Sequence, residues 1–282
     1  MKASSTRTQH QRNVTAITLP GLVDPHDLST DRQFSMNLAR GMEVLRAFSS
    51  ATPLLGNREI ADRTGLPKPT VSRLTYTLTL LGYLSRDPLL QKYKLGPGVL
   101  SLGHPLLASM HMRQLAKPLM ESIARSTGCT VNLGVRDRAS VVYVDSVRAD
   151  SANQHLPDIG SSRPLLVAAI GRALILAHAP AERTAILNYL KVQDPALFGQ
   201  HRPLWEADQK LFAAQGYCHS RGDWQRDLHA VAVPLRQPPG EPPLALNCTL
   251  AAYRVQGDFL VREVVPLLKD AARQLAVAQG MR

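Results

Sequence analysis

Apolar residues recur at helical spacing between about residues 35 and 81 and divide into three short segments. The first has an apolar residue at every third or fourth position, which predicts a helix that ends before Pro53. Asn57 is the expected N-cap of a second, short helix ending at Thr64, and Gly65 fits the left-handed residue that follows a helix. The apolar positions of the first helix are Leu38, Met42, Leu45 and Phe48.

The third segment predicts a helix followed by a hairpin. The helix opens at Pro67 or Pro69, where a missing N–H removes no helical hydrogen bond, and stops at Gly82. Two short extended segments, 83–86 and 91–95, then predict a β-hairpin. The apolar stripe of the helix is Val71, Leu74, Leu78 and Leu81.

The rest of the chain mixes helices and strands. Helical spacing over 99–126, with prolines at 105 and 118, predicts a linker helix and the first helix of a second domain. The order of the later elements predicts an α+β domain of sensor type. The expected strands are 130–135, 141–147, 230–235 and 244–250, and the expected helices are 167–179, 181–191 and 258–278.

These patterns divide the chain into four parts. Residues 1–33 form a polar tail, disordered or loosely docked, and 34–96 form the helical domain with its hairpin. Residues 97–112 form the linker helix, and 113–282 form the second domain.

Charge favours a polyanionic partner. There are 33 Lys and Arg residues against 22 Asp and Glu, a net charge of +11, which suits nucleic acid first and an anionic membrane second. A basic surface kept for solubility fits the composition equally well. The most apolar run, Leu165–Gly171, stops at Arg172, so no segment is long enough to span a bilayer. The three cysteines are far apart and suit reduced cytoplasmic thiols, and we expect a cytoplasmic protein.

Residues 57–74 have the spacing of a helix-turn-helix. Ala61 is the small residue where two helices cross, Gly65 makes the turn, and Val71 lies inside the second helix. The second helix would enter the major groove, and the hairpin would contact the phosphate backbone as a wing. The alternative is a solvated basic face, but nine Lys and Arg against four Asp and Glu over 35–96 favour DNA. The expected DNA-binding residues are Lys68, Thr70, Ser72, Arg73 and Tyr76 on the helix and Arg86, Lys92 and Lys94 on the hairpin.

The order of several short motifs resembles the IclR-type transcriptional regulators. The matching motifs include Glu59-Ile60-Ala61, Thr64-Gly65-Leu66-Pro67-Lys68, Leu81-Gly82-Tyr83, Tyr93-Lys94-Leu95-Gly96, Val142-Tyr143-Val144, Arg163-Pro164-Leu165, Gly171-Arg172-Ala173-Leu174 and Val231-Ala232-Val233-Pro234. The resemblance covers about residues 35–275. It implies a winged helix-turn-helix, a GAF-like effector domain, a dimer or tetramer, and control of a catabolic or metabolic operon.

The resemblance also implies a pocket for a small organic or aromatic acid. Main-chain N–H groups at the start of the helix near residue 168 would hold the anion. The implied effector-binding residues are Ala168, Ala169, Ile170, Ser220, Asp223, Asn247 and Thr249, and we add Trp224 as an apolar lining residue. Leu166 and Trp224 depart from the family's usual residues, which favours a bulky or aromatic ligand, unless both are ordinary core residues.

Other functions are less well supported. The alternative is an enzyme of unknown reaction with a basic DNA-binding accessory domain, but we find no catalytic constellation and expect neither enzyme activity nor a cofactor. A nonspecific architectural DNA binder would leave the second domain unexplained. His104 and His111 share a helix face without a further ligand, so we expect no metal site.

Overall fold

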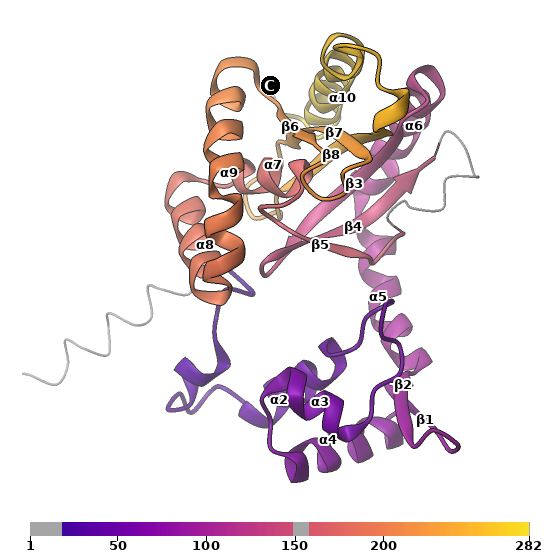
Figure 1. Ribbon diagram of the computed structural model, residues 1–282, viewed down its shortest axis with the longest axis vertical. Helices are drawn as coiled ribbons and strands as arrows, with labels where there is room; N and C mark the ends of the chain where they lie inside the picture. Colours follow the sequence, from indigo (N-terminus) through magenta and orange to yellow (C-terminus); the bar gives the residue numbers. More distant parts are fainter. Residues whose placement is uncertain (1–18, 149–157, 282) are drawn as a thin grey trace, which may run out of the picture. The chain divides into compact units, whose positions relative to one another are not determined.

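The chain folds into two compact units. The computed structural model describes residues 19–148 and 158–281 (Figure 1). One unit is Val23–Met110, and the other comprises the described parts of Met1–Leu22 and His111–Arg282. The boundary at residue 110 falls within the segment where the sequence predicts a linker.

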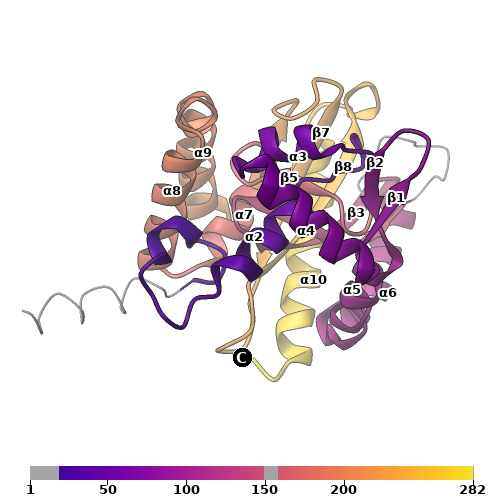
Figure 2. The ribbon, with the colours of Figure 1, turned by 90° about the horizontal axis from the view of Figure 1, so that it is seen from below.

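The first unit consists of helices and one β-hairpin (Figure 2). Strands β1 and β2 pair antiparallel, with Leu84 opposite Leu95. The elements are η1 (Pro25–Leu28), α2 (Met36–Arg46), α3 (Asn57–Thr64), α4 (Lys68–Leu80), β1 (Leu84–Asp87), β2 (Lys92–Leu95) and α5 (Pro97–Ser109). This arrangement confirms the predicted winged helix-turn-helix.

One apolar core holds this unit together. Gly65 ends α3 with φ +70°, as the turn requires. The core residues are Val44, Phe48, Leu55, Ile60, Ala61, Leu66, Val71, Leu78 and Leu84.

Two local predictions for this unit are wrong. The N-cap of α3 is Gly56, whose N–H donates to the Glu59 carboxylate at 2.7 Å. Asn57 is instead the first helical residue, and its side chain accepts from buried Thr75 at 3.2 Å. Leu81 is the C-cap of α4 and is exposed, because the helix ends before its apolar stripe returns to the core.

The second unit is built on one antiparallel sheet of six strands in the order β5-β4-β3-β8-β7-β6. Its strands are β3 (Thr130–Asp137), β4 (Ser140–Val147), β5 (Ser162–Pro164), β6 (Cys218–Arg221), β7 (Leu228–Leu235) and β8 (Leu244–Ala251). Its helices are α6 (His111–Thr127), α7 (Ala169–Ala177), α8 (Pro180–Gln193), α9 (Pro195–Gln215), η2 (Ala252–Arg254), the π-helical turn η3 (Leu260–Val264) and α10 (Val265–Ala278). These elements confirm the predicted α+β class.

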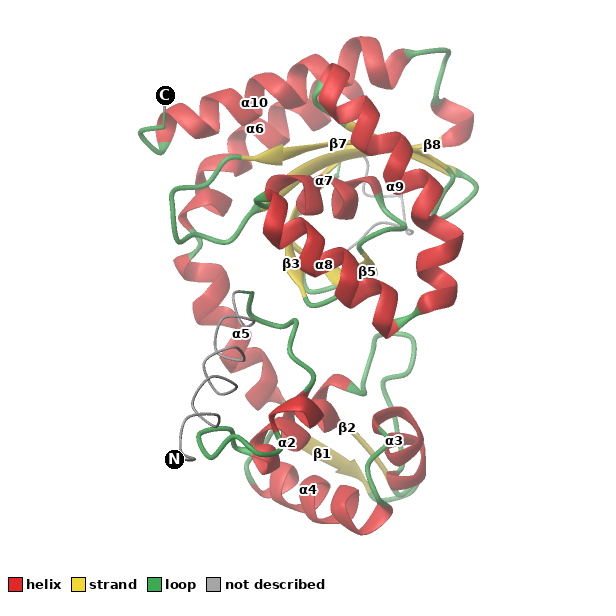
Figure 3. Cartoon of the chain, turned by 90° about the vertical axis from the view of Figure 1, so that its left-hand side faces the viewer, coloured by secondary structure: helices red, strands yellow, loops and turns green. Residues whose placement is uncertain are grey.

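The two faces of this sheet differ in side-chain size. Helices α6 and α10 pack on one face and α7 packs on the other (Figure 3). The face under α6 and α10 carries large apolar residues, including Val131, Leu133, Val231, Val233 and Leu246. The face under α7 carries small and polar residues, including Gly134, Ala230, Ala232, Asn132 and Asn247. The helix facing the small residues is therefore the one beside which space for a ligand can form.

Three features of this unit differ from the sequence expectation or add to it. Helix α9 was not predicted, because Gly199 and Pro203 interrupt its apolar spacing. The segment expected to hold a linker helix and the first helix of the second domain forms α5 and α6, which are separated at Met110. Of the expected tail, residues 1–18 lie outside the described part of the chain. Leu19 packs into the core beneath α7, and Arg136 donates to the Pro20 carbonyl at 3.0 Å.

Helix α7 packs so closely against the loop before it that a larger residue at Gly171 should lower stability. A Cβ at Gly171 would lie 2.2 Å from the Leu165 carbonyl oxygen, so Gly171→Ala should destabilise the second unit by about 3 kcal/mol through steric clash. A Cβ at helical Gly199 meets nothing within 4 Å. Gly199→Ala should therefore be neutral or stabilising by up to about 1 kcal/mol.

Urea unfolding followed by tryptophan fluorescence measures both effects, because the two tryptophans of the chain, Trp205 and Trp224, lie in this unit. Equal free energies of unfolding for the two variants would show that the close contact at Gly171 is absent in solution.

Candidate functional site

One face of α4 presents polar and cationic side chains to solvent. Lys68, Ser72, Arg73 and Tyr76 are exposed, and Thr70 is half-buried on the flank of the helix. The structure gives Lys68 and Arg73 no ion pair with any described residue. Two cations near a helix N-terminus, free of acidic partners, suit contact with phosphate or with guanine.

The three hairpin residues predicted to contact DNA differ in whether their side chains are already paired. Lys94 is exposed, whereas Lys92 forms an ion pair with Glu59 of α3 at 3.0 Å. Arg86 is exposed, donates to the Gln91 side chain, and stands opposite Tyr93 rather than opposite a lysine. Lys94 is therefore the hairpin lysine whose ammonium is free to meet a phosphate.

A chain of polar side chains crosses the sheet beneath α7. The Ser146 hydroxyl donates to Asn132 at 2.8 Å, and the Asn132 amide donates to Asn247 Oδ1 at 3.0 Å. This arrangement leaves the Asn247 amide N–H groups to donate elsewhere. The Thr249 hydroxyl, on the same face of β8, is buried and has no hydrogen-bond partner among the described residues. Such an unpaired buried group costs free energy unless a ligand or a water molecule satisfies it.

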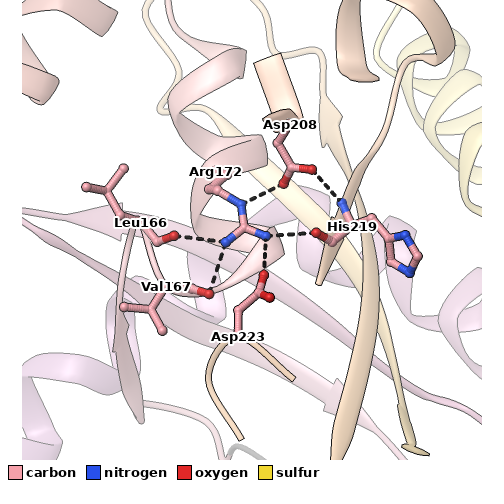
Figure 4. A network of polar contacts seen from close by, with 6 residues as sticks. All are labelled: Leu166, Val167, Arg172, Asp208, His219 and Asp223. Atoms are coloured by element: carbon pink, nitrogen blue, oxygen red, sulfur yellow. Dashed lines mark hydrogen bonds and ion pairs between the residues drawn. The ribbon is translucent and has the colours of Figure 1, made fainter. Parts of the chain in front are cut away.

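A buried arginine joins the segments around this face (Figure 4). The Arg172 guanidinium, in the first turns of α7, donates to the Asp208 carboxylate of α9 at 2.6 Å and to Asp223 at 2.8 Å. It also donates to the carbonyls of Leu166, Val167 and His219 at 2.9, 3.1 and 2.8 Å. These contacts engage Nε, Nη1 and Nη2, so the guanidinium has no donor left for a ligand.

Burial shifts the titration of the groups around Arg172. It raises the pKa of Asp208, against the opposing effect of the nearby Arg172. It lowers the pKa of His219 to about 4, helped by the positive charge of Arg221. His219 is therefore neutral at physiological pH, and the charge of the network comes from Arg172, Asp208 and Asp223.

The predicted effector residues lie around this face but are not equally available. Ala168 is the N-cap of α7, and Ala169 and Ile170 are its first residues. Asn247, Thr249 and Ser220 are buried on the strands beneath, whereas Asp223 is already bound by Arg172. Trp224 is 41% exposed and stacks on Arg163, so it is not a core residue.

Sequence reasoning missed the central role of Arg172. An arginine inside an apolar segment was the available signal, because a fully buried guanidinium requires partners. Leu166 belongs to the core, which supports the interpretation of this residue as ordinary packing. A groove of about 1170 Å³ lies elsewhere, along α10, and its lining contains none of the predicted effector residues.

Within the described ranges, 19–148 and 158–281, the structure contains no cluster of three or more His, Cys, Asp or Glu residues that could hold a metal ion. No described helix is long and apolar enough to cross a membrane. The three cysteines are buried and free, and burial raises the pKa of Cys218 and of Cys248, which keeps both thiols protonated.

Comparison with known families identifies both units. The IclR helix-turn-helix domain matches residues 37–88, and the "Bacterial transcriptional regulator IclR C-terminal" family matches residues 104–277. The chain belongs to the IclR family of transcriptional regulators. It is a regulator of transcription with a helix-turn-helix domain.

Individual relatives agree with this assignment. The chain is 32% identical to the HTH-type transcriptional regulator TsaQ1/TsaQ2 of Comamonas testosteroni, over 85% of this chain and 86% of that protein. It is 27% identical to the p-hydroxybenzoate hydroxylase transcriptional activator of Acinetobacter baylyi, over 90% and 96% of the two chains. The structure of an IclR family transcriptional regulator from Brucella abortus is similar to it, with 40% identity, a TM-score of 0.82 and coverage of 88% and 94%.

The Arg172 network predicts a large stability effect in this IclR-family protein. Arg172→Met would leave two carboxylates, one of them buried, without their cation and should destabilise the second unit by about 3–5 kcal/mol. The matched control is Arg202→Met, because exposed Arg202 pairs with Glu206 one turn along α9. Its loss should change stability by no more than about 0.5 kcal/mol.

The measurement is the free energy of unfolding in urea at neutral pH, followed by tryptophan fluorescence. A loss for Arg172→Met as small as that for Arg202→Met would contradict the described network.

Proposed function

We propose that the chain binds a two-fold symmetric operator through α4 and β1–β2. A small carboxylate that binds beneath α7 changes the affinity for this operator. The DNA-binding part is supported by the unpaired exposed cations Lys68 and Arg73 on α4. Ser72 and Tyr76 share the exposed face of that helix, and Arg86 and Lys94 supply backbone contacts from the hairpin.

The observation that carries the effector site is the unpartnered Thr249 hydroxyl beneath α7. Alanines at 230, 232 and 245 keep the strand side chains beneath α7 small, and the first N–H groups of α7 at Ala169 and Ile170 have no helical partner. An anion at that helix terminus meets the positive end of the dipole.

The chemistry of the site favours an organic carboxylate with an apolar body. Beneath α7, alanines alternate with the polar side chains Asn132, Asn247 and Thr249, a mixture typical of small-molecule sites. A relative named for activating p-hydroxybenzoate hydroxylase expression makes aromatic acids the first class to test.

We also propose that the protein acts in the cytoplasm without catalytic activity, because the relatives reported above are regulators of transcription. The operator DNA that it binds lies in the same compartment.

Arg73 provides the test of DNA binding. Arg73→Ala should weaken binding to an operator selected from random duplexes by about 1–3 kcal/mol, because the variant loses a base contact. Lys94→Ala should weaken binding to all sequences and lower the salt dependence by about one phosphate contact. Lys92→Ala should do less, since Glu59 already holds that ammonium.

Fluorescence anisotropy of labelled duplexes at several salt concentrations measures these effects. Unchanged operator affinity in a folded Arg73→Ala variant would rule out α4 as the recognition helix.

We propose further that the chain forms a homo-oligomer, a dimer or a dimer of dimers. Helices α2 and α5 of the first unit expose large apolar side chains, and an operator with two half-sites requires matching symmetry. The exposed residues are Leu38, Met42, Leu100, Leu102 and Leu106.

Sedimentation equilibrium tests this assembly. The native chain should be at least dimeric at micromolar concentration, and Leu102→Glu with Leu106→Glu should dissociate it and lower operator affinity. A monomer with full operator affinity would exclude the proposed interface.

A further inference from the structure

The charge around Arg172 presents a problem for any anionic ligand. Arg172 is bound by two carboxylates, those of Asp208 and Asp223, and its donors are all engaged. With both carboxylates ionised, the cluster carries a net negative charge beside the first turn of α7. A carboxylate ligand therefore needs a second cation, because buried charge is stable only when paired.

Arg163 is a cation placed to serve this purpose. It lies in β5, is half-buried, and its guanidinium carbon is 4.8 Å from the centre of the Trp224 ring. Its positive charge lies near the hydroxyl of Tyr143 and opposes the rise in the pKa of that phenol. Among the described residues it has no carboxylate partner, unlike Arg172.

Both neighbours of Arg163 border the effector site. Tyr143 pairs in register with Gly134, over which Ile170 of α7 packs, and it belongs to the same core as Ile170. Trp224 directly follows Asp223, which reaches the Arg172 guanidinium. Arg163 thus joins the strand side of the site to the β6–β7 loop.

The three side chains form a set that can recognise a carboxylate. The Tyr143 hydroxyl carries a proton that it can donate to a ligand oxygen beside Arg163. Burial raises the pKa of Tyr143 to about 12, which keeps that proton in place. Arginine and phenol donors to one carboxylate make short, charge-assisted hydrogen bonds. The flat faces of the indole and phenol rings favour a planar ligand body.

We propose that Arg163, held between Trp224 and Tyr143, binds the carboxylate of the effector and that the effector is an aromatic monocarboxylate. This assignment rests on the effector site proposed above and adds the group that selects an anion. The N–H groups of α7 support the same anionic group, and the side chains of Asn247 and Thr249 meet the other polar atoms of the ligand.

The test compares a charged probe with its neutral isostere in the full-length protein. Calorimetry measures the binding of benzoate and of benzamide to the native chain and to Arg163→Met, Arg163→Lys and Tyr143→Phe. Arg226→Met is the matched control, because Arg226 is an exposed cation of the same loop as Trp224 and has no ion pair among the described residues. Urea unfolding followed by tryptophan fluorescence verifies that the second unit of each variant is folded.

The native chain should bind benzoate more tightly than benzamide, and Arg163→Met should abolish this preference through a loss of roughly tenfold or more for benzoate alone. Arg163→Lys should restore part of the preference, and Tyr143→Phe should reduce it. Arg226→Met should bind both probes as the native chain does.

Two other outcomes would separate the claims. Equal benzoate affinity in Arg163→Met and Arg226→Met, together with a loss of affinity in Asn247→Leu, would overturn the role of Arg163. The effector site beneath α7 would then stand without it. If benzoate, 4-hydroxybenzoate and phenylacetate all fail to bind the native chain at millimolar concentration, the aromatic-carboxylate class is overturned, and with it the assignment of Arg163.

Discussion

The buried guanidinium of Arg172 is the constraint on which the rest of the effector unit depends. Removing such a charge from water is costly, and the cost is offset only when every donor has a partner. Here those partners come from the loop before α7, from α9, and from β6 and the loop after it. One side chain thereby fixes three segments that are distant in sequence, and it fixes them around the N-terminus of α7.

This constraint explains why one face of the sheet is suited to ligand binding. Arg172 holds the loop so close to α7 that only glycine fits at 171, and α7 itself lies over the small residues of the sheet. The closest packing is thus between α7 and the loop before it. Beside α7, the Thr249 hydroxyl and the Asn247 amide N–H groups are left without hydrogen-bond partners among the described residues. A ligand that enters there replaces missing hydrogen bonds instead of breaking existing ones. Because Asp223 is tied to Arg172 and Trp224 to Arg163, a ligand bound between them can change the position of the β6–β7 loop.

The sequence was sufficient for the overall architecture because local signals and global packing agree there. The apolar spacing, the turn at Gly65 and the hairpin all specify the winged domain. Its core contains Phe48, Val71 and Leu78, which the spacing selects, with Leu45 and Leu74 packed against it. One helix is an exception. Helix α9 contains Gly199 and Pro203, so its local preference is weak and tertiary contacts through Asp208 and Trp205 decide it.

The candidate site was harder to predict for a related reason. Periodicity reports burial, and it placed Ala168 and Asn247 correctly on buried elements, but it does not report which polar groups bind each other. Asp223 was expected to contact the effector and is bound to Arg172, and Lys92 was expected to contact phosphate and is bound to Glu59. Partners that lie 33 to 51 residues away along the chain leave no signal in the spacing of a single sequence.

The central claim is that ligand binding beneath α7 and operator binding through α4 are energetically coupled. The direct measurement is the affinity for one selected operator with and without saturating benzoate, together with the affinity for benzoate with and without operator. The account predicts that both affinities change by the same factor, roughly fivefold or more, because coupling free energy is reciprocal. Tight benzoate binding that leaves the operator affinity unchanged would contradict it.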